Sequence, residues 1–207
     1  MNLDFNMNPI DRKRIKAAFK RTAVLRTREL QTAGIPRACL RDAANAGIIE
    51  KVERGLYRLS GFRVSEQHSL ASAAKRVPQG VVCLLSALRF HSLTTQNPHE
   101  IWMALPGKAW RPQAVQQPLR FIWLYGAAFE SEIETHQIDG ADVKIYSVAK
   151  TVADCFKYRN KLGLDVALEA LREAWRERRC TMDDLVRCAK ICRVANIMRP
   201  YLESLTT

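Results

Sequence analysis

The sequence predicts an α+β protein with two domains: a basic, mainly helical N-terminal domain and a larger C-terminal α+β domain. Glycine and proline divide the first sixty residues into short helix-sized segments and a hairpin. Short extended runs then predict a small, mainly antiparallel sheet, and helical periodicity returns from Ser147 to give a helical C-terminal end. With 207 residues, the chain is long enough for domains at residues 1–62 and 63–207.

Positive charge is concentrated in the first domain. The chain has a net charge of +12, with 13 basic and 6 acidic side chains in residues 1–62 and 20 and 15 in residues 63–207. Such a balance favours a polyanionic partner, either nucleic acid or an anionic membrane surface. The N-terminal residues lack the order of a secretory signal, and no apolar run approaches the roughly 20 residues of a membrane helix. We therefore expect a soluble, cytoplasmic protein without a membrane partner.

Local signals place three helices and a hairpin in the first domain. Thr27 is expected to cap a short helix that Gly34 ends, Pro36 opens the next helix, and Gly55 supplies the hairpin turn. The expected helices span residues 10–22, 27–33 and 36–47, and the expected strands span residues 48–53 and 56–59. This order predicts a winged helix-turn-helix, a fold that commonly binds DNA.

The third helix has one apolar face and one arginine face. At helical spacing, Leu40 and Ala43 point inward, whereas Arg37 and Arg41 lie one turn apart on the opposite side. They stand near the helix start, which enters the major groove in such domains, and each guanidinium can bind a guanine edge. Asn45 is either an adenine contact or the cap of the helix end. Further cations are expected to contact phosphates, namely Arg12, Lys13, Lys16, Lys51, Arg54 and Arg58.

The second domain is expected to begin with helices and continue through a sheet to more helices. Two helices are expected at residues 66–77 and 81–91, four extended segments at 101–105, 119–124, 133–138 and 143–146, and four helices at 147–158, 164–179, 182–192 and 195–205. Thr181 and Asp184 have the spacing of a capping box, with Asp in place of Glu.

Motifs for catalysis or cofactor binding are weak. The six cysteines form no C-x-x-C pair, and no phosphate-binding G-x-x-x-x-G-K-[ST] loop occurs. Ser86, His91 and Asp154 can be arranged as a hydrolytic triad only on paper, since no G-x-S-x-G turn is present. We expect neither enzymatic activity nor a cofactor or metal.

Several segments together resemble a known family. They are "TRELQTAGI" and "LRDAANAGIIEKVERGLYRL" in the first domain, and "CLLSALRFHSLTTQNP", "IYSVAKTVADCFKYRNKLGLDVALEALREAW" and "VANIMRPYLESL" in the second. Together they resemble the AbiEi antitoxins of type IV toxin-antitoxin systems over nearly the whole chain after Leu25. One departure is Lys150, where the family commonly carries arginine before the Thr of T-V-A-D, so a role that needs a guanidinium fork is in doubt.

The resemblance implies a repressor and antitoxin. Such proteins bind DNA upstream of their own operon and counter a nucleotidyltransferase toxin, in systems of phage defence by abortive infection. The partners it implies are duplex operator DNA with repeats, occupied by several copies of a monomer or dimer, and a toxin that need not form a stable complex. Alternatives are a solitary regulator without a toxin and an RNA-binding protein. In the second domain a candidate partner surface comprises His91, Thr94, Lys150, Asp154, Lys157 and Arg159.

Overall fold

The structure, a computed structural model, describes residues 8–20, 22–61, 67–110, 112 and 118–205. These residues form two compact units. The first comprises the described residues of Met1–Pro78 together with His136–Val143, and the second comprises those of Gln79–Gln113, Gln117–Thr135 and Lys144–Thr207. Both units mix helices and strands, so the predicted α+β class is confirmed.

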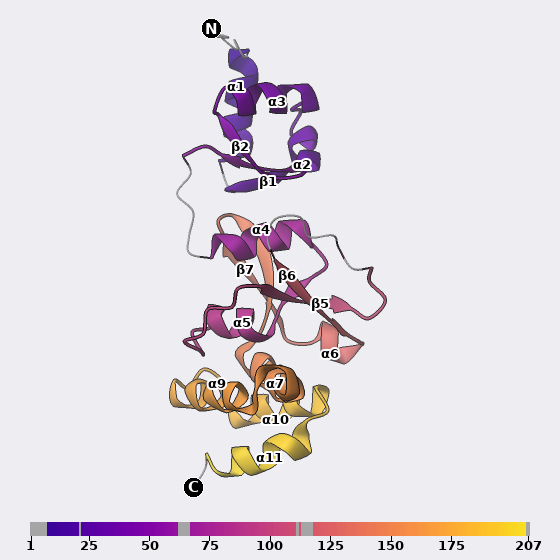
Figure 1. Ribbon diagram of the computed structural model, residues 1–207, viewed down its shortest axis with the longest axis vertical. Coiled ribbons are helices and arrows are strands. Elements are labelled where there is room, and N and C mark those ends of the chain that lie inside the picture. Colours follow the sequence, from indigo (N-terminus) through magenta and orange to yellow (C-terminus); the bar gives the residue numbers. More distant parts are fainter. Residues whose placement is uncertain (1–7, 21, 62–66, 111, 113–117, 206–207) are drawn as a thin grey trace. The chain divides into compact units, whose positions relative to one another are not determined.

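The first unit contains the predicted helices and hairpin and one further strand (Figure 1). Its elements in Met1–Pro78 are α1 (Pro9–Ala18), β1 (Val24–Arg26), α2 (Thr27–Thr32), α3 (Arg37–Asn45), β2 (Ile49–Glu53), β3 (Leu56–Leu59) and α4 (His68–Arg76). The strands form an antiparallel sheet in the order β1-β3-β2. Sequence analysis missed β1, because a strand of three residues has too little pattern to be seen without its partner.

A small apolar core holds these helices on the hairpin. Its buried members are Ile15, Phe19, Leu25, Leu30, Ile35, Leu40, Ala43 and Ile49. The inward face predicted for α3 is therefore correct. Cys39, half-buried on that helix, places its thiol 3.6 Å from the Asp11 carboxylate of α1. Burial and this carboxylate raise the pKa of Cys39, so the thiol is protonated and donates to Asp11.

Two helix boundaries differ from the predictions. Thr27 does not cap α2: the N-cap is Arg26, whose backbone N–H donates to the Glu29 carboxylate at 2.7 Å, while the Thr27 hydroxyl donates to the Gly55 carbonyl at 3.3 Å. The α1 helix ends at Ala18 and not at Thr22. Thr22 is buried, and its hydroxyl donates to the Val24 carbonyl two residues later, a local bond that competes with helix.

The first unit also includes α4 and the turn between β7 (Ile133–Ile138) and β8 (Ala141–Tyr146). Lys75 of α4 pairs with Glu29 of α2 at 2.5 Å. His68 Nδ1 lies 2.8 Å from the Asp139 carboxylate in the turn, and the Asp139 carbonyl accepts a hydrogen bond from the backbone N–H of Ala23. The domain boundary after residue 62 remains a prediction, and these contacts group α4 with the elements before it.

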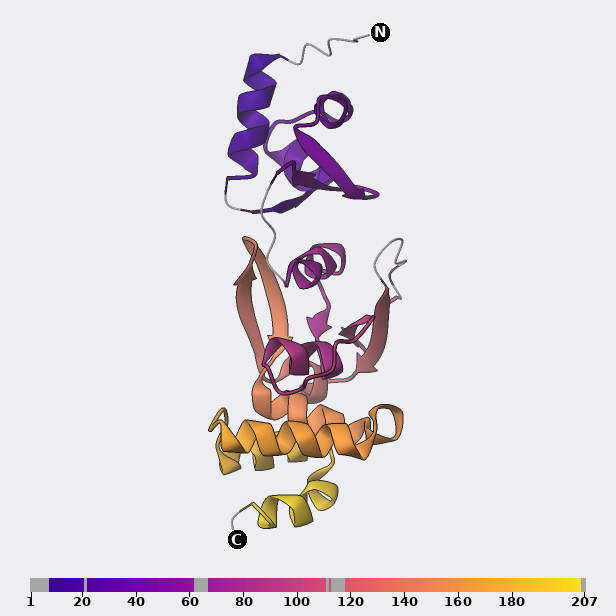
Figure 2. The same ribbon diagram turned by 60° about the vertical axis from the view of Figure 1, so that its left-hand side comes forward.

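The second unit builds its helices around a mixed sheet (Figures 1 and 2). Besides parts of β7 and β8, its elements are β4 (Val81–Val82), α5 (Leu84–Phe90), β5 (Ile101–Pro106), β6 (Leu119–Leu124), α6 (Ala127–Glu130), α7 (Val148–Lys157), α8 (Arg159–Leu162), α9 (Leu164–Arg176), α10 (Met182–Ile191) and α11 (Ala195–Glu203). The strand order is β6-β5-β4-β8-β7. β5 runs parallel to β6 and antiparallel to β4, and β4 runs parallel to β8. The helices α7, α9, α10 and α11 pack together, as the predicted helical end requires.

The helix predicted for residues 81–91 is instead a strand followed by a helix. Val81 and Val82 pair with Ala104 and Met103 of β5, and Cys83 is still extended. β-branched residues favour such a ladder, and α5 begins only at Leu84. The periodicity of a short apolar run cannot distinguish the two structures.

A charged pair lies inside the second unit. Lys150 Nζ is 2.5 Å from the Asp154 carboxylate, and both side chains are fully buried. The ammonium also lies 4.1 Å from the centre of the Tyr146 ring, and the Cys192 thiol lies 3.2 Å from the other Asp154 oxygen. Burial opposes the charge on Lys150, but the Asp154 carboxylate together with the Cys192 and Cys83 thiols outweighs burial, so the pKa of Lys150 is raised. This pair was expected on a surface, and that expectation is wrong because neighbouring elements bury α7 from Val148 to Phe156.

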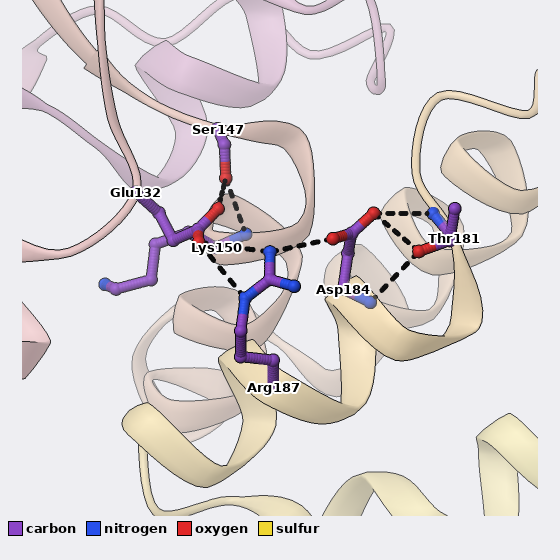
Figure 3. Close-up of polar contacts among 6 residues, drawn as sticks. All are labelled: Glu132, Ser147, Lys150, Thr181, Asp184 and Arg187. Atoms are coloured by element: carbon purple, nitrogen blue, oxygen red, sulfur yellow. Dashed lines mark hydrogen bonds and ion pairs between the residues drawn. The ribbon is translucent and has the colours of Figure 1, made fainter.

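A more exposed polar network joins α10 to the sheet (Figure 3). Thr181 and Asp184 form the predicted capping box at the start of α10. Arg187 donates to Asp184 at 2.7 Å and to Glu132 at 3.1 Å, and the other Glu132 oxygen accepts from the Ser147 hydroxyl, which caps α7. Hydrogen bonds from the Thr181 hydroxyl and backbone N–H, together with Arg187, lower the pKa of Asp184 to about 2.

Breaking the buried pair should destabilise the protein strongly. Lys150→Met leaves the Asp154 carboxylate buried without its cation, so we expect a loss of about 3–5 kcal/mol in the free energy of unfolding. In Lys150→Met/Asp154→Leu no charge remains to be buried, so the double variant should lose less than the single one. Urea unfolding measures both. A single variant of wild-type stability would contradict the buried pair.

The α10 capping box should make stability depend on acid. The pKa of Asp184 is about 2 in the folded chain, against an ordinary value of 3.8 for an aspartate. The ionised Asp184 carboxylate therefore stabilises the fold fully above about pH 4, and this stabilisation disappears as the pH falls through 2. Asp184→Asn should therefore flatten the decline in melting temperature over this interval. Thr181→Ala should cost about 1 kcal/mol at neutral pH. Equal acid sensitivity of Asp184→Asn and wild type would refute this assignment.

Candidate nucleic-acid interface

The α3 helix presents two arginines to solvent at its N-terminal end. Arg37 is the first residue of the helix and is exposed, and the Arg41 side chain, one turn later, is 82 % exposed. Leu40 and Ala43 on the other face are buried in the core. Arg41 Nε reaches the neighbouring Asp42 only at 4.0 Å, a distance at the limit of an ion pair. Both guanidinium groups therefore lie outside the core and are accessible to solvent.

Asn45 does not cap α3. Asn45 is the last helical residue, the C-cap is Ala46, and Gly47 follows with a φ of +66°. Backbone N–H groups of Ala46 and Gly47 donate to the carbonyls of Asp42 and Ala44 and so close the helix. The exposed Asn45 side chain thus keeps only its other predicted role, as a contact to a base.

The β2–β3 hairpin forms a wing with one paired and two exposed cations. Lys51 and Arg54 are exposed, and Gly55 supplies the turn with a φ of +77°, a conformation that favours glycine. Arg58 lies directly across the ladder from Glu50 and forms an ion pair with it. The structure therefore separates Arg58 from the other predicted phosphate contacts, because a partner would have to compete with Glu50.

The α1 helix carries the third group of predicted contacts. Ile15 and Phe19 anchor it in the core, while Arg12, Lys13 and Lys16 are exposed. Other exposed cations of this unit were not proposed from the sequence, namely Arg14, Lys20 and Arg28. The helical period of α1 was a sufficient signal for Arg14 and Lys20, which also lie off the buried stripe.

Most of the surface predicted for the second domain is interior. His91 and Thr94 are buried, as are Lys150 and Asp154. His91 Nε2 lies 2.8 Å from the Tyr146 carbonyl, and the Thr94 hydroxyl accepts from the backbone N–H of Gln96. These four residues stabilise the fold, and their expected exposure is wrong. Lys157 and Arg159 are half-buried and keep part of their surface accessible.

The weak catalytic candidate Ser86 also has a structural partner. Ser86 is buried and accepts a hydrogen bond from the backbone N–H of Trp102, so its hydroxyl supports β5. Among the described residues, no three His, Cys, Asp or Glu side chains gather closely enough to hold a metal ion.

Comparison with known proteins agrees with this geometry. Residues 13–60, which span the helices, the turn and the wing, match the family model described as "Transcriptional regulator, AbiEi antitoxin". The N-terminal segment is therefore similar to regulators of the AbiEi type. The predicted resemblance is thus confirmed over the part of the chain that holds Arg37 and Arg41.

One solved structure is similar to this chain at the level of the fold. The crystal structure of the RV2827C protein from Mycobacterium tuberculosis matches with a TM-score of 0.55 and 14 % sequence identity, and the match covers 88 % of this chain and 72 % of that one. At this identity the match supports the fold alone. A search of curated proteins finds no match. Within the described part of the chain, no helix has the length and apolarity to cross a bilayer.

Proposed function

We propose that the protein is a DNA-binding repressor of its own operon and the antitoxin of a type IV toxin-antitoxin system. The exposure of Arg37 and Arg41 at the start of α3, in a segment of the AbiEi regulator type, carries this proposal. In helix-turn-helix domains this end of the second helix of the motif enters the major groove.

Each part of the first unit has a role in this proposal. Arg37 and Arg41 bind guanine O6 and N7, and Asn45 binds an adenine edge. Lys51 and Arg54 on the wing, with the exposed cations of α1, neutralise phosphates and position α3 without specifying sequence. Arg58 contributes only when DNA displaces Glu50. Several copies bind one operator with repeats, as monomers or dimers, in the cytoplasm.

The antitoxin part of the proposal rests on the family match. The functional partner is a nucleotidyltransferase toxin encoded beside the gene, in a system of phage defence by abortive infection. The second unit counters it without enzymatic activity. The regulatory and antitoxic activities are thus assigned to different units of the chain.

Footprinting on the duplex upstream of the gene tests the repressor. Wild type should protect a repeat, and Arg37→Ala/Arg41→Ala should lose this protection, because each arginine contact to guanine is worth about 1–3 kcal/mol. Arg172→Gln/Arg199→Gln, which removes two exposed arginines of the second unit, is the charge-matched control and should protect normally.

If about six phosphates are neutralised, the logarithm of the binding constant should fall with the logarithm of the salt concentration at a slope near −5. Uniform coating that the α3 variant retains would refute specific binding and favour an RNA or protein partner.

Growth rescue tests the antitoxin. Co-expression with the nucleotidyltransferase from the adjacent reading frame should restore growth for wild type. Arg37→Ala/Arg41→Ala should restore it equally when both genes have an unrelated promoter, since the variant leaves the second unit unchanged. If the wild-type chain fails to rescue growth, the antitoxin proposal is contradicted and the chain is a solitary regulator without a toxin.

A further inference from the structure

A small cavity lies in the second unit where β6, α7 and α10 end. Its volume is about 250 Å³. Trp123 at the end of β6 and Tyr125 in the turn to α6 supply its aromatic side, and Ala127 and Ala128 of α6 add small side chains. The proposed repressor and antitoxin roles assign no ligand to this cavity.

Two aromatic rings of the cavity are held in place while much of their surface stays exposed. Trp123 is 36 % exposed and Tyr125 is 69 % exposed. The Trp123 indole N–H donates to the Ala109 carbonyl at 3.1 Å, which fixes the orientation of the ring. The Tyr125 ring lies against Gly107, where an added Cβ would be 1.9 Å from Tyr125 Cε1. Only glycine at residue 107 leaves room for the ring in this position.

Both charged side chains that line the cavity are cations. Lys157 stands in the last turn of α7, and Arg193 follows the C-cap of α10. Within the described residues, neither one forms an ion pair with a carboxylate, in contrast to Arg187 on the same α10 helix. Cations at helix ends also favour the helix dipole. The helix dipole alone does not explain why both Lys157 and Arg193 lie beside exposed aromatic rings.

The cavity also lies at the carboxyl end of a strand. β5 and β6 are parallel, and the cavity includes Leu124 and Tyr125 directly at the carboxyl end of β6. In open α/β sheets, ligands bind beyond the carboxyl ends of the strands where the strand order reverses, and this cavity shares the carboxyl-end position although β6 is an edge strand. Chain segments distant in sequence thus bring planar apolar surface and positive charge to one such edge.

We propose that this cavity binds one nucleotide, with its base stacked on Tyr125, the more exposed of the two rings, and its phosphate held by Lys157 and Arg193. A nucleotide combines a planar aromatic face with an anion, which matches the two kinds of lining residue. The volume of about 250 Å³ lies just below the range of ~300–1,000 Å³ for drug-sized ligands, so the cavity admits no more than one nucleotide unit, part of which stays outside it. The source is either a free mononucleotide or the terminal nucleotide of a single strand.

Isothermal titration of the full chain with AMP, adenosine and 5′-phosphorylated tetradeoxyadenylate tests the site. We expect saturable binding with one site per chain, weaker for adenosine because it lacks the phosphate. Tyr125→Leu and Lys157→Gln/Arg193→Gln should each weaken binding by about tenfold or more, since one removes a stacking ring and the other both cations. The glutamine variants remove both charges and keep polar side chains, and thermal unfolding verifies that each variant folds.

The controls separate this site from general charge and from the α3 surface. Arg172→Gln/Arg199→Gln and Arg37→Ala/Arg41→Ala should both bind the probes as wild type does. Tight AMP binding identifies a free nucleotide, and preference for the oligonucleotide identifies a strand end. Absence of saturable binding, or equal weakening in either control, overturns the proposal. The operator footprint of Lys157→Gln/Arg193→Gln should remain intact, so failure here is distinguishable from failure of the repressor.

Discussion

The second unit is organised around a charged pair that water does not reach. Lys150 and Asp154 each lose their hydration, and the short contact between them, the Tyr146 ring and the Cys192 thiol replace it. This arrangement requires α7 to be covered by α5, α9, α10 and α11, which all contact it. A lysine suits residue 150, because one compact ammonium can contact the Asp154 carboxylate and the Tyr146 ring at the same time.

In the first unit, by contrast, most of the positive charge lies at the surface. A small apolar core involves α1, α2, α3 and the hairpin, and most cations of the unit remain outside it. The burial of Ile15 and Phe19 orders α1, and Leu40 and Ala43 order α3, so each helix has a fixed outer face. The free energy of folding comes from the apolar residues, which leaves Arg37 and Arg41 available for binding.

The two units therefore offer different chemistry to anionic partners. The first has helix and wing cations suited to the regular phosphates of a duplex. The second combines Trp123 and Tyr125 with Lys157 and Arg193 around a cavity of single-nucleotide size. Stacking needs a base that is free of its helix, so a duplex fits the first surface and not the second.

Sequence by itself determined the local elements and the sign of their charges. Gly34, Pro36 and Gly55 restrict the backbone directly, and helical spacing separates Arg37 from Leu40, so the helix-turn-helix, the wing and the exposed arginines were predictable. Tertiary structure alone decided what depends on partners distant in the chain. The short strands β1 and β4 form only through pairing with their neighbours. Helical spacing cannot tell whether the face with Lys150 and Asp154 is covered. Trp123, Lys157 and Arg193 come together only after the strands and helices pack. Periodicity shows which residues share a face, whereas burial depends on what else packs there.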